Sequence, residues 1–172
     1  MIERYKKRMD ANDPIATFNV GKYYADGKYG YPQDHSKAFK HWRRAAELGY
    51  VEAYSSIGYA FDKGEGVVEV DKKKARHYYE LAAMGGNVLG RHNLGVNEAK
   101  AGNIDKSLKH FMIAAKSGHN ESLKKIQELY PYGCVRKEDY TKALQSYQSY
   151  LNEIKSPQRD EAAAFDENCQ YY

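Results

Sequence analysis

Small and aromatic residues recur with helical spacing in two stretches of the chain that lie 37 residues apart. One stretch has Ala38, Trp42, Ala45 and Ala46, and the other has Ala75, Tyr79, Ala82 and Ala83. Each set steps by four, three and one residues, which places one aromatic and three small side chains on the same face of a helix. The pattern therefore predicts two equivalent helices in two equivalent units.

The same offset of 37 residues relates the surroundings of these helices as well. Of twelve matched positions between residues 16–49 and residues 53–86, nine are identical. A shortened third copy occupies 90–118, a divergent fourth occupies 122–151, and residues 1–12 match the second half of a unit. A period of roughly 20–50 residues is typical of an array of stacked repeats.

The repeats predict how the chain divides into domains. We expect a single solenoid domain over residues 1–154, in which residues 1–12 form an N-terminal cap helix. Residues 155–172 contain no further copy, and we expect a C-terminal tail that is either disordered or folded back over the last repeat.

Each full copy is expected to form two antiparallel helices. Gly21, Gly58 and Gly95 fall in the middle of the first helix, where glycine costs about 1 kcal/mol relative to alanine. A cost that recurs at one position indicates close contact between helices. We expect the alanine pairs of the second helix to pack against these glycines.

The ends of the second helix also carry recurring residues. Asp34, Asp71, Asn103 and Asp139 stand where an N-cap is expected. Gly49, Gly86 and Gly118 follow the helix, where a left-handed residue commonly ends it.

These residues form a motif, Ala-x₃-aliphatic-Gly-x₂-(Tyr/Phe)-x₂-Gly followed by Asp-x₂-Lys-Ala-x₃-(Trp/Tyr)-x₂-Ala-Ala-x₂-Gly. The motif resembles the Sel-one-like repeat (SLR), a relative of the tetratricopeptide repeat, and the resemblance covers nearly the whole chain. It implies an all-α fold, a right-handed α-α superhelix (solenoid) of about four helix-turn-helix repeats plus an N-terminal half-repeat. It also implies an adaptor or scaffold that holds another protein in a concave groove.

Composition bears on whether the protein enters a membrane and on the cellular compartment in which it resides. Hydrophobic residues make up 42% of the chain, the mean hydropathy is −0.85, and no apolar run approaches the roughly 20 residues that span a bilayer. We therefore expect no membrane partner. The first residues lack the apolar core of a signal peptide, and only Cys134 and Cys169 are present, which favours the reducing cytoplasm.

Motifs that carry catalysis or bind cofactors are absent from the sequence. It contains no GxxxxGK[ST], no GxSxG and no HExxH. The six histidines lack the i, i+4 or paired Cys/His spacing of metal ligands. We expect no enzymatic activity, no cofactor and no metal.

Clusters of basic residues raise a different hypothesis. The net charge is +4, and Lys and Arg gather at 4–8, 40–44, 72–76 and 124–125. Together with 17 tyrosines available for base stacking, they make a nucleic-acid-binding helical-repeat protein the alternative. However, most clusters fall on second helices, which the resemblance places on the convex side, and no residue set recurs as a base code. We therefore disfavour nucleic acid as the partner.

The concave face carries the candidate binding residues. If the geometry of tetratricopeptide repeats carries over, first-helix residues outside the core face the groove. These are Phe18, Asn19, Lys22, Ser55, Ser56, Tyr59, His92, Asn93, Val96, Lys124, Lys125 and Glu128. They combine rings, amides and charges, as peptide-binding surfaces do. For Phe18, an alternative is packing against the N-terminal half-repeat.

From these residues we predict a non-enzymatic interaction module that binds a protein or peptide segment in its concave groove. A further alternative is a substrate-recruiting fragment of a larger regulatory or degradation protein. The molecule is expected to be a monomer, or a weak homo-oligomer joined through the C-terminal tail.

Overall fold

The computed structural model describes residues 2–66 and 68–154, and within these ranges the chain is helical with connecting loops and has no strand. The α-helices are α1 (Ile2–Asp10), α2 (Pro14–Asp26), α3 (His35–Glu47), α4 (Val51–Lys63), α5 (Lys72–Met84), α6 (Val88–Lys100), α7 (Ile104–Lys116), α8 (Asn120–Leu129) and α9 (Lys137–Ile154). A short 3₁₀ helix, η1 (Tyr130–Tyr132), follows α8. The predicted all-α fold is confirmed, whereas the predicted tail at 155–172 lies outside the described residues.

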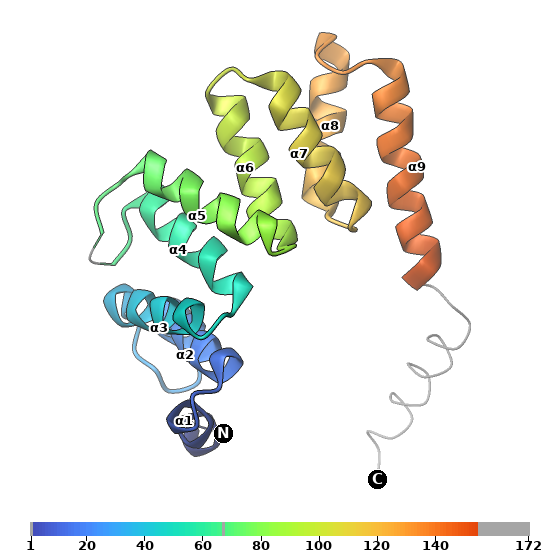
Figure 1. Cartoon of the computed structure of the whole chain (residues 1–172). Helices are drawn as coiled ribbons and strands as arrows, with labels where there is room; N and C mark the ends of the chain where they lie inside the picture. Colours follow the sequence, from blue (N-terminus) through green and yellow to red (C-terminus); the bar gives the residue numbers. More distant parts are fainter. Residues whose placement is uncertain (1, 67, 155–172) are drawn as a thin grey trace.

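The helices pack in consecutive pairs. α2 packs against α3, α4 against α5, and α6 against α7, and each pair also contacts the next through α3 and α4, α5 and α6, and α7 and α8. Every pair contacts its neighbours in sequence, and the buried apolar residues of the described chain form three clusters along the stack instead of one core. The described helices follow an arch from α1 to α9 (Figure 1).

One face of the stack is formed by the first helix of each pair, α2, α4 and α6. α4 and α6 contact each other directly as well as through α5. Side chains from these helices can therefore meet across repeat boundaries. We call the surface made by α2, α4 and α6 the first-helix face.

The N-terminal helix α1 covers the open end of the first pair. The ring of Tyr5 meets that of Tyr23 edge-on, with 5.4 Å between centroids. After the helix, the side-chain oxygen of Asn12 accepts a hydrogen bond of 2.8 Å from Arg44 on α3. These contacts reach both helices of the pair, so α1 packs as the preceding half-repeat would.

The mid-helix glycines are explained by aromatic rings, and the prediction that alanine pairs pack against them is wrong. A Cβ added to Gly58 would lie 2.7 Å from the ring of Tyr79, a distance that real Cβ atoms essentially never show. The equivalent distances are 2.7 Å from Gly21 to Trp42 and 2.6 Å from Gly95 to Phe111. The large ring reaches across to the first helix, which the small alanines cannot do. Ala82 of the second pair packs instead against the next repeat, where a Cβ on Gly90 would lie 2.5 Å from the Ala82 Cβ.

The predicted glycines after the second helix adopt the expected conformation in three pairs, and the predicted N-caps form in the first two. Gly49, Gly86 and Gly118 have φ of 87°, 86° and 85°, the left-handed conformation expected after a helix. The side chains of Asp34 and Asp71 each accept a 2.9 Å hydrogen bond from a backbone N–H three residues on. Both predicted caps are therefore present.

The two later caps are not formed as predicted. The amide of Asn103 donates a 2.8 Å hydrogen bond to Glu98 instead of capping α7, because the shortened loop brings it beside a buried carboxylate that needs a donor. Asp139 lies inside α9, which begins two residues earlier, and it accepts a 2.8 Å hydrogen bond from Arg136. A carboxylate in the first turn still interacts favourably with the helix dipole.

Candidate functional site

A hollow of about 450 Å³ opens on the first-helix face between the first and second pairs. Its walls come from α2, α4 and the beginning of α6. His35 and Trp42 from α3 and Glu65 from the loop after α4 also line it. Its volume lies within the range of roughly 300–1,000 Å³ that is usual for binding sites. Because the walls come from three consecutive repeats, the hollow depends on their stacking.

Five of the residues proposed for the concave groove line this hollow, namely Phe18, Lys22, Ser55, Ser56 and Tyr59. Tyr59 is 43% exposed, and the Nζ of Lys63 lies 5.9 Å from its ring centroid. Phe18 is half-buried, with its ring centroid 5.0 Å from that of Tyr50. Phe18 therefore packs toward the next repeat, and Tyr23 makes the contact with the N-terminal helix.

Ser55 contributes to the wall of the hollow but not as an exposed hydroxyl. It is only 4% exposed, and its Oγ donates a 2.8 Å hydrogen bond to the backbone oxygen of Glu52 in its own helix. The side chain is thus already satisfied within α4. Ser56 and Tyr59 also line the hollow from this helix.

The other residues proposed for the groove do not line this hollow. Asn19 and Asn93 are half-buried, and Val96 packs against the apolar cluster formed by α7, α8 and α9. Lys124 and Glu128 are exposed on α8, where they form 2.7 Å ion pairs with Glu121 and Lys125. The first-helix stripe predicted from the sequence is therefore not one continuous pocket.

His92 makes contacts that the sequence did not predict. Its Nδ1 lies 2.8 Å from Oγ of the buried Ser122, and Nδ1 of His119 lies 3.0 Å from the same oxygen. The two imidazole centroids are 4.6 Å apart. Burial and the neighbouring charge of His119 lower the pKa of His92 to about 4, and burial lowers the pKa of His119. His92 thus joins α6 to the beginning of α8.

The hollow carries charged residues that sequence reasoning missed. Asp26, Glu52 and Glu65 line it together with one ammonium group, Lys22. Asp26 follows Lys22 by four residues, and Glu52 precedes Ser56 by four, so extending the predicted stripe by one helical turn finds both. Glu65 comes from a loop, where its Oε2 lies 3.6 Å from Nδ1 of His35, and no spacing in the sequence indicates it.

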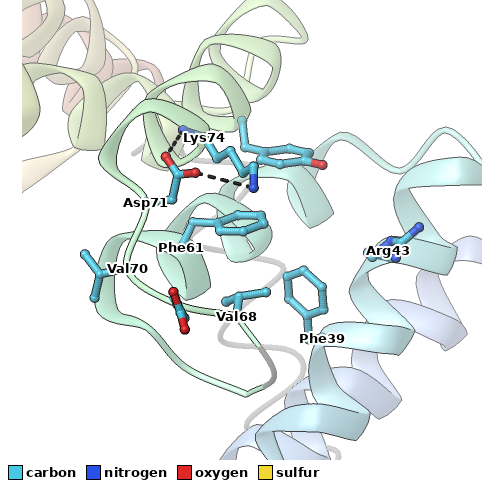
Figure 2. Close-up of a pocket in the computed structure, with 9 residues that line it drawn as sticks. Phe39, Arg43, Phe61, Val68, Val70, Asp71 and Lys74 are labelled. Atoms are coloured by element: carbon cyan, nitrogen blue, oxygen red, sulfur yellow. Dashed lines mark hydrogen bonds and ion pairs between the residues drawn. The ribbon is translucent and has the colours of Figure 1, made fainter.

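A second hollow, of about 530 Å³, lies between α3, α5 and the loop that precedes α5. Figure 2 shows Phe39, Phe61 and Val68 turned toward one another, with Arg43 farther along the same helix as Phe39. Phe39 and Phe61 meet edge-on at 5.7 Å, and the Nζ of Lys74 stands 5.3 Å from the Phe61 ring. These rings contact each other across the repeat boundary, so this hollow is a seam in the packing and holds none of the predicted binding residues.

Basic residues in the predicted clusters are mostly paired with acids. The pairs are Arg8 with Asp13, Arg43 and Arg44 with Glu47, Lys72 with Asp62, Lys74 with Asp71, Arg76 with Glu80 and Glu98, Lys124 with Glu121, and Lys125 with Glu128. Charge already neutralised by a neighbouring carboxylate attracts phosphate less strongly. The pairing therefore gives no support to a nucleic-acid surface on the second helices.

The described part of the chain has neither a metal-binding cluster nor a helix that could span a membrane. Within residues 2–66 and 68–154, no three His, Cys, Asp or Glu side chains come together as a metal-binding group. Across the same residues, no helix has both the length and the apolar character needed to cross a membrane.

Two curated relatives share part of their sequence with this chain. The ERAD-associated E3 ubiquitin-protein ligase component HRD3B of Arabidopsis thaliana is 33% identical over 101 residues, which is 59% of this chain and 16% of the relative. Chitin synthase regulatory factor 4 of Schizosaccharomyces pombe is 28% identical over 125 residues, which is 73% of this chain and 20% of the relative. The chain thus spans a fifth or less of the length of these relatives.

Solved structures share the arrangement of the helices. A Sel1 repeat protein from Oxalobacter formigenes superposes with a TM-score of 0.71 at 26% identity, over 90% of this chain and 62% of that protein. A protective antigen of uropathogenic Escherichia coli that displays an SLR fold gives a TM-score of 0.72 at 29% identity, over 89% of this chain and 33% of that protein. Both likenesses support the solenoid assignment.

The family model described as Sel1 repeat matches three segments of the chain, residues 14–50, 51–87 and 90–119. These segments coincide with the pairs α2–α3, α4–α5 and α6–α7, whereas the fourth copy proposed from the sequence lies outside them. More than half of the chain is matched, and the chain belongs to the Sel1 repeat family.

Proposed function

We propose that the hollow on the first-helix face holds a segment of a partner protein and that the chain acts as a non-catalytic adaptor. The observation that carries the proposal is the placement of Tyr59 and Leu89, which are 43% and 50% exposed, on adjacent walls of one recess. Apolar side chains kept partly in water at a recess act as anchors for binding, because a partner that covers them gains their burial.

The surrounding packing supports this role. Trp42 and Phe18 in the lining are held by the core of the first two pairs, so the recess exists before a partner arrives. A preformed site avoids part of the ordering entropy that binding otherwise costs. The relatives also support an interaction role, since one is named as a component of a ligase and the other as a regulatory factor.

Capture from a native extract tests the proposal. The wild-type chain is compared with Tyr59→Ala/Leu89→Ala, and bound proteins are identified by mass spectrometry. The matched control is Met84→Ala/Ile113→Ala, because these side chains are 82% and 50% exposed on second helices and do not line the hollow. We expect a protein that binds the wild type and the control but not the Tyr59→Ala/Leu89→Ala variant. If both variants retain the same proteins as the wild type, the hollow does not bind the partner.

A second candidate function is a recruiting segment of a larger degradation protein. The observation that favours it is the 33% identity with a ligase component of which the matched region is only 16%. Coding sequence that continues the reading frame on either side of residues 1–172, with further repeats or a ligase-associated region, would support this candidate. A frame closed on both sides would leave the independent adaptor as the function.

A further inference from the structure

We infer that the segment held in the first-helix hollow is extended and carries Lys or Arg on either side of bulky apolar residues. This inference rests on the proposed function and adds the chemistry of the partner. It comes from the distribution of charge around the hollow, which differs from that of the whole chain.

The lining of the hollow reverses the sign of the overall charge. The chain has a formal net charge of +4, yet three carboxylates and one ammonium group line the recess. Asp26 is neutralised in part by Lys28, with 3.1 Å between Nζ and Oδ2. Glu52 has no ion pair within the described residues, and Glu65 has only the imidazole of His35 at 3.6 Å. Glu52 and Glu65 are therefore the carboxylates left for a cation from outside.

These two carboxylates stand at opposite ends of α4. Glu52 lies in the first turn of the helix, and Glu65 follows its last residue by two positions. A helix of 13 residues is about 20 Å long. An extended segment advances about 3.3 Å per residue, so about six residues match the length of α4.

Large apolar or aromatic side chains lie in the lining between the carboxylates, together with Ser56 and Lys22. Tyr59 lies on α4 between them, and Phe18 and Leu89 face the hollow from α2 and α6. Bulky side chains of the segment would cover these anchors while its basic residues approach Glu52 and Glu65. An acidic segment would meet like charge at both ends, which disfavours it.

A library of random dodecapeptides displayed on phage tests the inference with the full chain at physiological salt. We expect enrichment of Lys or Arg on both sides of aromatic or large aliphatic residues. A synthetic peptide from the enriched set should bind Glu52→Gln/Glu65→Gln about tenfold more weakly, as expected for two exposed ion pairs. The control Glu138→Gln/Glu153→Gln removes the same charge from exposed positions on α9 and should leave binding unchanged. The variant Glu52→Lys/Glu65→Lys should select acidic peptides instead.

The outcomes separate this inference from the proposed function. Enriched peptides that lack Lys and Arg, or that bind the two double Gln variants equally well, overturn the inference about charge. If their binding is still lost in Tyr59→Ala/Leu89→Ala, the proposed function stands. Failure to enrich any peptide, or binding that is insensitive to Tyr59→Ala/Leu89→Ala, overturns both.

Discussion

The guanidinium of Arg76 on α5 lies 2.7 Å from Oε1 of Glu98 on α6, and this ion pair joins two consecutive repeats. Glu98 is 1% exposed, and its other oxygen accepts a 2.8 Å hydrogen bond from Asn103. Burial raises the pKa of Glu98, but the bond from Asn103 and the charge of Arg76 outweigh it and leave the pKa below its ordinary value of 4.5. The repeat boundary thus contains a buried charge whose partners come from both sides.

Replacing Arg76 by Met should strongly weaken the contact between the second and third pairs. The substitution leaves the buried Glu98 with Asn103 as its remaining partner, and we expect the free energy of unfolding in urea to fall by about 1–3 kcal/mol, since Arg76 itself is half exposed. In the control Arg43→Met, the lost pair is exposed, with 4.0 Å to Glu47, and the loss should stay below about 1 kcal/mol. Equal losses in the two variants would show that the buried carboxylate of Glu98 does not need the charge of Arg76.

Gly58→Ala should destabilise the protein although alanine normally favours a helix. Alanine in the middle of an exposed helix stabilises it by about 1 kcal/mol relative to glycine. Here the new methyl group would overlap the ring of Tyr79, and overpacking of this kind costs about 1–3 kcal/mol. Urea unfolding of Gly58→Ala, Tyr79→Leu and the double variant measures the coupling. We expect the smaller Leu side chain to relieve the overlap, so purely additive losses would contradict this packing.

Trp42→Phe should change stability by less than about 1 kcal/mol, because two effects oppose each other. The indole Nε1 of Trp42 is buried and has no hydrogen-bond partner among the described residues, so its removal relieves a penalty. The smaller ring also loses some contact area, yet Phe111 occupies the equivalent place in the third pair. Trp42→Ala should instead cost about 3–5 kcal/mol. Circular dichroism is the suitable probe, since Trp42 is the only tryptophan. A large loss in Trp42→Phe would mean that the indole N–H is satisfied after all.

The imidazole of His92, packed beside His119 and Ser122, should make stability depend on pH. The pKa of His92 in the folded protein is about 4, below its ordinary value of 6.5, under the influence of burial, His119, Glu121 and Lys125. Between these two values the unfolded chain binds the proton more readily, so stability is full above pH 6.5 and declines as the pH falls toward 4. Urea unfolding at pH 7 and pH 5 should show a smaller decline in His92→Gln than in the wild type. Identical declines would exclude His92 as a source.

The repeat period predicts the helices, and it predicts the helix ends of the first two pairs, because residue types close in sequence set these ends. The positive φ of Gly49 and Gly86 and the caps at Asp34 and Asp71 follow from residue types that few alternatives can replace. The packing against Gly58 was assigned to the wrong partner, because the sequence indicates that a helix approaches but not which of its side chains reaches furthest.

The candidate site was predicted only in part. Phe18 and Tyr59 belong to one helical stripe, and a stripe can be read from spacing alone. His92 lies on a similar stripe but bonds to Ser122, which comes from another helix pair, and Glu65 enters the hollow from a loop. Contacts of this kind depend on how the repeats are stacked, and no periodic pattern encodes them.

Site-specific photo-crosslinking tests the central claim, that the first-helix hollow holds a partner segment, most directly. A benzophenone amino acid is placed at Tyr59 in the hollow or at Ile113 on the second helix α7, positions that are 43% and 50% exposed. After irradiation in a native extract, we expect position 59 to give adducts with one short segment of a protein and position 113 to give none. Adducts that are the same at both positions, or absent at position 59, would contradict the account.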